Sequence, residues 1–253
     1  MTYFRGALFR AYMFLTTPLM AVALAPALLF GREGARLSAK IWCRAMLWGL
    51  GAMTGVRSRV EGSDFMPKAA AIVASNHQSM WETLFLFATL PRPAFVVKQE
   101  LLRVPIFGPW LRATGAIALD RNAGPRALRR LKEEAAERLA GQDQLVIFPE
   151  GTRVAPGAKA AFLPGVAGVY RGANAPVTPV AHNSGEHWLH PGPEKIPGGI
   201  ILRFLPPIPA DFDRRAFLGE LKTRIDAARP DLASSTATVG HGGAAEPTVA
   251  RQA

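Results

Sequence analysis

An uncharged stretch of twenty residues, from Ala11 to Phe30, most constrains what this chain can fold into. The only members that are not apolar are Thr16, Thr17, Pro18 and Pro26. A helix of this length reaches about 30 Å, which matches the apolar layer of a bilayer. The stretch therefore predicts a helix that contacts or crosses a membrane.

A second apolar stretch runs from Ile41 to Val56 and carries Trp42 and Trp48. Tryptophan favours the headgroup layer of a membrane. A polar link over residues 31–40 joins the two stretches. We expect residues 1–56 to form a membrane-binding helical pair that dips into or lies along one leaflet. Full crossing by the first stretch and a buried helical hairpin of a soluble domain are the alternatives.

A cleaved secretory signal is a further alternative for the first stretch. Arg5 and Arg10 precede it, and Ala23-Leu24-Ala25 looks like a cleavage site. Pro26 would follow the cut, and proline is unfavourable there.

If the stretch crosses the bilayer, the cations after Phe30 outnumber those before the stretch, which places the rest of the chain on the cytoplasmic side.

Beyond Arg57, short apolar runs separated by turn residues predict strands that are buried on both faces. A helix is predicted between Pro125 and Gly141, because Leu128 and Leu131 begin an apolar stripe along it. Strands that alternate with helices indicate an α/β fold, and we expect a mixed, largely parallel sheet flanked by helices over residues 57–229. The predicted strands are residues 70–75, 94–98, 116–120, 144–148, 177–181 and 199–205.

Composition limits the classes of function. The chain has 253 residues, enough for one large domain with appendages. Its net charge of +11 attracts nucleic acid, anionic lipid or an acidic protein. Cys43 is the only cysteine, which excludes a disulfide framework and a cysteine-based zinc site. Residues 230–253 have few large apolar side chains and are expected to be a disordered tail.

Familiar nucleotide and hydrolase motifs are absent from the sequence. It contains no Gly-x-Gly-x-x-Gly fingerprint, no P-loop and no Gly-x-Ser-x-Gly elbow. His182, His187 and His190 lie close together without the spacing of a zinc motif, and we expect no metal. Trp188 either lines an acyl groove or anchors its own loop.

His77 and Glu82 form the first candidate group for chemistry. They follow the predicted strand 70–75, at the edge where α/β proteins place their sites. Five residues of regular helix turn through about 500°, so only a bend between the two brings them together. With His77 in a turn and Glu82 in the first helical turn, the carboxylate holds one ring nitrogen and leaves the other free as a base.

The segment Phe-Pro-Glu-Gly-Thr-Arg, residues 148–153, forms the second group and follows the predicted strand 144–148. Gly151 lets the main chain approach a ligand closely. Arg153 offers a planar fork of donors suited to phosphate, and exposed N–H groups beside it suit an oxyanion. Taken alone, the segment is equally consistent with a turn that carries a solvated salt bridge.

Together, in this order and about seventy residues apart, the two groups resemble the 1-acylglycerol-3-phosphate O-acyltransferase family of glycerolipid acyltransferases. That family carries a His-x4-Asp block, a Lys with a Pro-x-x-Gly segment, a Phe-Pro-Glu-Gly-x-Arg block and a Val-Pro-type strand. The matching segments here are residues 76–82, 98–121, 148–153 and 177–180.

The resemblance implies that His77, held by Glu82, removes the proton from a glycerol hydroxyl, which then attacks an acyl thioester. It implies that Arg153 holds the acceptor's phosphate, with Arg121 and Lys98 as further candidates. Other residues of the second group would shape the acceptor and oxyanion site, and these are Glu150, Gly151 and Thr152.

The implied function is transfer of a fatty acyl group to the sn-2 hydroxyl of 1-acylglycerol 3-phosphate, which gives phosphatidic acid in phospholipid biosynthesis. Acyl-acyl-carrier-protein or acyl-CoA would be the co-substrate, with no further cofactor. The expected partners are a lipid acceptor and an anionic membrane surface, with no nucleic acid. The expected location is the inner (cytoplasmic) membrane, with the active site facing the cytoplasm.

Two positions depart from the family pattern. Glu82 stands where the family usually has Asp, and Leu163 stands where many relatives have Lys. The second departure leaves open a different acceptor, such as lyso-ornithine lipid or another lysophospholipid. A membrane-associated binding or scaffold protein without turnover is the alternative from another class.

Overall fold

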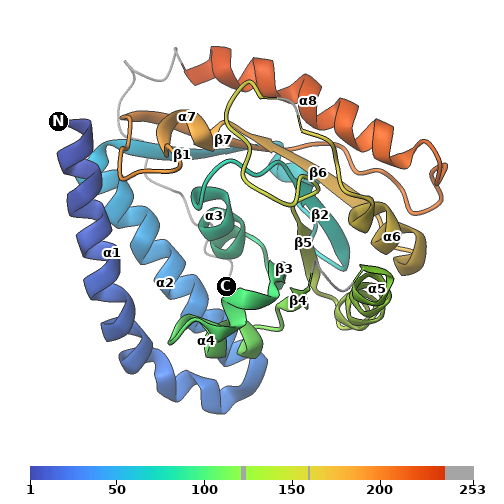
Figure 1. Cartoon of the computed structure of the whole chain (residues 1–253), viewed down its shortest axis with the longest axis horizontal. Coiled ribbons are helices and arrows are strands. Elements are labelled where there is room, and N and C mark those ends of the chain that lie inside the picture. Colours follow the sequence, from blue (N-terminus) through green and yellow to red (C-terminus); the bar gives the residue numbers. More distant parts are fainter. Residues whose placement is uncertain (121–123, 159, 237–253) are drawn as a thin grey trace.

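A computed structural model describes residues 1–120, 124–158 and 160–236 of the chain (Figure 1). The predicted site residue Arg121 and residues 237–253 of the expected tail lie outside the described residues. The boundary expected at Pro230 is wrong, because helix α8 (Phe217–Thr236) continues past it. That helix begins with Phe217, Leu221 and Ile225, which are four residues apart and fully buried against the sheet.

Seven strands form one sheet in the order β1-β7-β6-β2-β5-β3-β4. Neighbouring strands are parallel except β6 and β7, which are antiparallel. The prediction of a mixed, largely parallel sheet flanked by helices is therefore confirmed. The strands are β1 (Val56–Glu61), β2 (Ala71–Ser75), β3 (Pro93–Lys98), β4 (Ile117–Leu119), β5 (Gln144–Ile147), β6 (Val177–His182) and β7 (Gly198–Phe204).

Strand β1 was not predicted, and its sequence explains why. It reads Val-Arg-Ser-Arg-Val-Glu and pairs only with β7, at one edge of the sheet. Its second, third and fourth residues are exposed, so it needs no continuous apolar run. The six predicted strands, by contrast, correspond to β2 through β7.

Helices cover both faces of the sheet (Figure 1). In the central strand β2, Ile72 and Ala74 face one cluster of buried side chains and Val73 faces the other. This two-sided burial is the reason for the continuously apolar strand sequences. The helices and helical turns are α1 (Thr2–Leu24), η1 (Ala25–Phe30), α2 (Gly31–Thr54), η2 (Ser63–Phe65), α3 (Trp81–Thr89), η3 (Gln99–Arg103), α4 (Phe107–Ala113), α5 (Gly124–Ala140), α6 (Pro164–Ala173), α7 (Ser184–His187) and α8.

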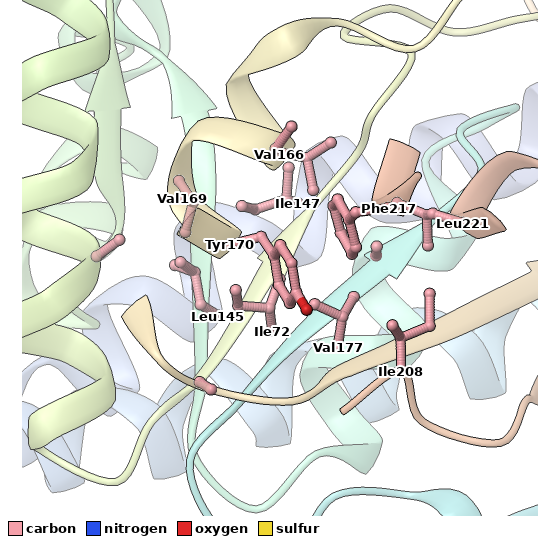
Figure 2. Packing of buried hydrophobic residues seen from close by; sticks show 14 of the residues in the cluster. Ile72, Leu145, Ile147, Val166, Val169, Tyr170, Val177, Ile208, Phe217 and Leu221 are labelled. Atoms are coloured by element: carbon pink, nitrogen blue, oxygen red, sulfur yellow. The ribbon is translucent and has the colours of Figure 1, made fainter. Parts of the chain in front are cut away.

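Figure 2 shows the core on the face covered by α5, α6 and α8. The ring of Tyr170 stacks on that of Phe217, with centroids 3.9 Å apart. Its hydroxyl lies 2.8 Å from the carbonyl oxygen of Pro209, so the one polar atom of this side chain is satisfied. This packing fixes α6 and α8 against the strands whose ends carry the site.

On the other face, α1 and α2 form a helical pair that runs beside the sheet (Figure 1). The prediction that residues 31–40 form a polar link between two helices is wrong, because α2 begins at Gly31 and includes all of these residues. The two helices approach closely at Gly49, where a Cβ would lie 2.4 Å from the ring of Tyr12. The hydroxyl of Tyr12 donates to the carbonyl oxygen of Ala45 at 3.1 Å.

Residues 31–40, which the sequence predicted to be a polar link, are helical because ion pairs with the buried Asp143 attach them to the α/β domain. Arg36 is 2% exposed and its Nη2 lies 2.6 Å from Oδ2 of Asp143, which is fully buried just before β5. Nε of Arg92 lies 3.3 Å from Oδ1 of the same carboxylate. Nη1 of Arg36 also donates to Glu33 at 2.8 Å. These ion pairs attach the start of α2 to the α/β domain.

The outer surface of α1 and η1 remains apolar and uncovered. The exposed side chains there include Phe14, Leu15, Leu19, Val22, Leu29 and Phe30. By length and composition, the helical segment Thr2–Thr54 could cross a membrane, and none of its most apolar 18-residue window is buried. An apolar surface of this kind is typical of a membrane or protein contact.

Candidate active site

The candidate residues come together because the strands before them are neighbours. β2 lies between β5 and β6 and is parallel to both, so all three end at the same edge of the sheet. The turn after β2 carries His77, and the loop after β5 carries residues 148–154. The carboxyl edge of such a sheet is the usual place for an α/β active site.

His77 and Glu82 are hydrogen-bonded as the sequence predicts. Nδ1 of His77 lies 2.7 Å from Oε1 of Glu82, across a turn that ends where α3 begins at Trp81. Because an ionised carboxylate only accepts, Nδ1 carries the ring proton and Nε2 is left as the basic nitrogen. Among the described residues, no group hydrogen-bonds Nε2.

Glu82 is fully buried yet richly hydrogen-bonded. Its Oε1 also accepts from the main-chain N–H groups of Gln78 at 2.8 Å and Ser79 at 2.9 Å. Its Oε2 accepts from the hydroxyls of Ser79 and Ser184, each at 2.7 Å. The longer side chain, compared with the Asp of the family pattern, is therefore fixed in place by several donors.

These donors decide the charge of Glu82. Burial by itself opposes ionisation, but the nearby His182 and the hydrogen bonds from His77 and Ser79 hold the pKa of Glu82 below its usual range. Glu82 is therefore ionised at neutral pH. An ionised carboxylate stabilises the imidazolium that forms when His77 takes up a proton.

Phe148 lies flat against the imidazole of His77. The ring centroids are 4.1 Å apart and the planes differ by 16°. The loop after β5 also holds the main chain of the turn, because Val154 N–H donates to the carbonyl oxygen of His77 at 2.8 Å. The second motif thus orients the histidine of the first.

Glu150 has a different place from the one expected. It was predicted to shape the acceptor and oxyanion site, but its side chain is buried and is not part of the cavity wall. Its Oε2 accepts from the main-chain N–H of His77 at 2.6 Å. The carboxylate therefore lies behind the histidine, where it holds the main chain of the turn.

A cavity of about 590 Å³ opens at His77 and runs beneath α1 and α2. Its wall is mostly apolar and includes Trp42 of α2, Phe87 of α3 and Trp110 of α4. The polar residues of the wall include Lys98, Thr152, Arg153 and His190, and His190 lies near both Arg153 and His77. Such a cavity suits a ligand with one polar end and a long apolar part.

Of the three cations predicted to bind phosphate, the structure describes Arg153 and Lys98. Both are exposed and line the cavity, Lys98 at the carboxyl end of β3 and Arg153 after β5. Nη1 of Arg153 lies 3.5 Å from Nδ1 of His190. Burial and the charge of Arg153 lower the pKa of His190, which keeps that ring neutral. Leu163, the second departure from the family pattern, also lines the cavity with its apolar side chain.

Gly151 and Thr152 both line the cavity. Gly151 has φ +67°, a conformation that a side chain would strain. Its N–H donates to the carbonyl oxygen of Phe148 at 2.9 Å and is used within the turn. Among the described residues, the main-chain N–H groups of Thr152 and Arg153 have no hydrogen-bond partner, which makes them the candidate oxyanion donors.

Sequence reasoning missed the supporting role of His182. This fully buried ring donates from Nε2 to the carbonyl oxygen of Asn76 at 2.7 Å, and its Nδ1 accepts from the N–H of Ser184 at 3.3 Å. Burial lowers the pKa of His182, so the ring is neutral near pH 7 and becomes charged only in more acidic solution. The side chain of Asn76 exchanges two further hydrogen bonds with the main chain of His182. Asn76 directly precedes His77, and this adjacency was the available signal.

The structure also places Trp188, for which the sequence left two roles open. Trp188 is not part of the cavity wall; its ring packs edge-on against Phe9 at 5.4 Å and lies under Lys195. It anchors its loop to α1. Within the described ranges, no three His, Cys, Asp or Glu side chains gather to hold a metal ion.

Comparisons with known proteins agree with this geometry. The family model described as Acyltransferase matches residues 57–183. A 1-acyl-sn-glycerol-3-phosphate acyltransferase of Pseudomonas aeruginosa is 36% identical over 204 residues, which are 81% of this chain and 79% of that protein. The 1-acyl-sn-glycerol-3-phosphate acyltransferase alpha of Bos taurus is 28% identical over 79% of this chain and 71% of its own.

A solved structure has the same fold. The crystal structure of the 1-acyl-sn-glycerophosphate (LPA) acyltransferase from Thermotoga maritima superposes with a TM-score of 0.77. The match covers 92% of this chain and 98% of that one, at 22% sequence identity. The similarity therefore extends beyond the α/β domain to the N-terminal helices.

Proposed function

The chain belongs to the acyltransferase family, among the 1-acyl-sn-glycerol-3-phosphate acyltransferases, and we propose that it acylates the sn-2 hydroxyl of 1-acylglycerol 3-phosphate. The acyl donor is a thioester, acyl-CoA or acyl-acyl-carrier-protein, and the product is phosphatidic acid. The observation that carries this proposal is the hydrogen-bonded His77–Glu82 pair, whose imidazole lines a mostly apolar cavity.

The pair supports general-base catalysis. Nε2 of His77 takes the proton of the acceptor hydroxyl while the hydroxyl oxygen attacks the thioester carbonyl carbon. The tetrahedral intermediate then expels the thiolate, the C–S bond breaks, and the imidazolium returns the proton to sulfur. Glu82 holds Nδ1–H throughout and stabilises the imidazolium. General-base help of this kind contributes about 10²–10⁴-fold in rate.

Substrate binding divides between the two ends of the cavity. Arg153 and Lys98 provide charge-assisted hydrogen bonds to the acceptor's phosphate. The apolar wall beneath α1 and α2 holds a fatty acyl chain, since each buried methylene contributes about 0.8 kcal/mol. The main-chain N–H groups of Thr152 and Arg153 stabilise the oxyanion.

The helical pair supports a location in the membrane. The uncovered apolar surface of α1 and η1 faces away from the α/β domain, while ion pairs such as Arg36–Asp143 attach α2 to it. This arrangement favours a pair that lies in one leaflet, with the cavity open towards the lipid acceptor. The net charge of +11 attracts anionic lipid headgroups, and the proposed location is the cytoplasmic side of the inner membrane.

A second acceptor is favoured by one observation. Leu163 places an apolar side chain in the cavity wall where many relatives have a lysine, which leaves fewer cations for a phosphate. Lyso-ornithine lipid, which carries no phosphate, fits this difference. The same His77–Glu82 chemistry would serve either acceptor.

A direct assay separates the two acceptors. The purified chain in liposomes receives lysophosphatidic acid or lyso-ornithine lipid with labelled acyl-CoA or acyl-acyl-carrier-protein. We expect phosphatidic acid as the main product, and Arg153→Ala should raise KM for lysophosphatidic acid about 10- to 100-fold. The matched control is Arg129→Ala, which removes an exposed arginine of α5 that pairs with Glu133. Selective use of lyso-ornithine lipid would favour the second acceptor, and no transfer to either would contradict the proposal.

A further inference from the structure

The main chain of His77 is held on both sides by the loop after β5. Its N–H donates to Oε2 of Glu150 at 2.6 Å, and its carbonyl oxygen accepts from Val154 N–H at 2.8 Å. The first of these bonds is charge-assisted only when Glu150 is ionised. The placement of the imidazole therefore depends on the charge of a carboxylate that does not touch the cavity.

The other oxygen of Glu150 faces helix α8. Nη1 of Arg229 lies 4.0 Å from Oε1 of Glu150 and 3.5 Å from Oδ1 of Asp226. The Arg229 side chain is 19% exposed, and its Nη2 is buried with no hydrogen-bond partner in the part of the chain that the structure describes. A mostly buried guanidinium with spare donors thus lies beside the carboxylate that holds His77.

The surroundings of Glu150 make this cation important. The charged groups that act on Glu150 are Glu82 of α3 and Asp226 and Arg229 of α8, and the main-chain N–H of His77 donates to it. The buried His182 lies near Glu82 and Arg229. The net effect of its surroundings raises the pKa of Glu150 to about 7, with burial as the largest cause, while the His77 N–H and Arg229 act to lower it. Glu82 and Asp226 are anionic neighbours and contribute to the rise. Arg229 is thus the cation that favours ionised Glu150 at neutral pH.

We propose that Arg229 is a positioning residue: it favours the ionised form of Glu150, and Glu150 in turn holds the main chain of His77 so that Nε2 meets the acceptor hydroxyl. Helix α8 lies beyond residues 57–183, the segment that the family model matches. The C-terminal helix would thereby take part in setting the active-site geometry. This inference rests on the proposed general-base role of His77.

The first experiment compares Arg229→Ala, Arg229→Lys and Arg224→Ala in the full chain. Arg224 is the matched control on α8, since it pairs with Glu220 and the carbonyl oxygen of Pro206 instead of the site. We expect Arg229→Ala to lower kcat about 3- to 30-fold near pH 7, with KM nearly unchanged, because coupled neighbours interact to this extent. The loss should shrink at higher pH, since Glu150 ionises there without help. Arg229→Lys should recover most of the activity, and Arg224→Ala should match the wild type.

A double-mutant cycle then tests the route through Glu150. Glu150→Gln keeps the shape of the side chain but removes the charge, so adding Arg229→Ala to it should cause no further loss. An equal loss in both backgrounds, or an acid limb of kcat/KM that does not move to higher pH in Arg229→Ala, would overturn the inference.

A measurement without turnover separates this inference from the proposed function. The amide proton of His77 donates to Glu150, so its NMR chemical shift reports the ionisation of that carboxylate. The midpoint of this titration should move to higher pH in Arg229→Ala and should be unchanged in Arg224→Ala. If His77→Ala retained full activity, the general-base proposal would fail. If His77→Ala is inactive but the titration midpoint of the His77 amide is the same in the wild type and in Arg229→Ala, only the proposed role of Arg229 fails.

Discussion

The ring of Phe148 stacks on the imidazole of His77 at 4.1 Å, so one motif of the site fixes the orientation of the other. Stacked aromatic pairs contribute about 0.5–1.5 kcal/mol beyond their buried area. We therefore expect Phe148→Ala to lower kcat about 2- to 12-fold, with a smaller effect for Phe148→Tyr, which keeps the ring. Steady-state kinetics with lysophosphatidic acid check this, and equal kcat values for Phe148→Ala and the wild type would show that the stacking does not orient His77.

Glu82 should govern both activity and acid stability. The pKa of Glu82 is lower in the folded chain than the value of about 4.3 in an unfolded one, so its stabilisation is present above about pH 4.3 and is lost as the pH falls through the folded pKa. We expect Glu82→Gln to lose about 10²–10⁴-fold in kcat and to flatten the acid decline of the free energy of unfolding. Urea denaturation at a series of pH values measures the second effect. An unchanged slope below about pH 4.3 would contradict the assignment.

The attachment of α2 depends on Asp143. This fully buried carboxylate meets Arg36 and Arg92, and its loss leaves the buried Arg36 with only the exposed Glu33 as an ion partner. We expect Asp143→Ala to lower the free energy of unfolding by about 3–5 kcal/mol. Glu133→Ala is the control, because it breaks an exposed pair with Arg129 and should cost at most about 0.5 kcal/mol. Equal denaturation midpoints for the two variants would rule out the anchoring role.

The outer surface of α1 should bind membranes. Phe14 and Leu19 are 71% and 70% exposed in the structure and have no apolar cover there. Each such side chain gains about 1.5–3 kcal/mol on burial in an apolar layer. We expect the double variant Phe14→Ser, Leu19→Ser to lower partitioning into vesicles at least tenfold in a sedimentation assay. Unchanged partitioning of a correctly folded variant would indicate that this surface does not meet lipid.

Most of the fold could be predicted because its strands are buried on both faces and therefore read as continuous apolar runs. Strand β1 could not, since an edge strand with exposed Arg57, Ser58 and Arg59 lacks that pattern. The helical start of α2 was also hidden, because its polar residues are explained by a buried partner, Asp143, more than a hundred positions away. Long-range ion pairs leave no local signal in the sequence.

The contacts of the candidate site likewise divide into local ones that the sequence could predict and long-range ones that it could not. The bond between His77 and Glu82 is local, and chain geometry was enough to predict it. The place of Glu150 behind His77 was not predictable, because it depends on how the ends of β2 and β5 meet. The same is true of Ser184, which reaches Glu82 from the end of β6.

The most direct test of the account is acyl transfer to lysophosphatidic acid by the wild type and by His77→Ala in the same liposomes. The account predicts phosphatidic acid formation by the wild type and a loss of at least about 10²-fold in kcat for His77→Ala, with membrane binding unchanged. A His77→Ala variant that forms phosphatidic acid at nearly the wild-type rate would contradict it.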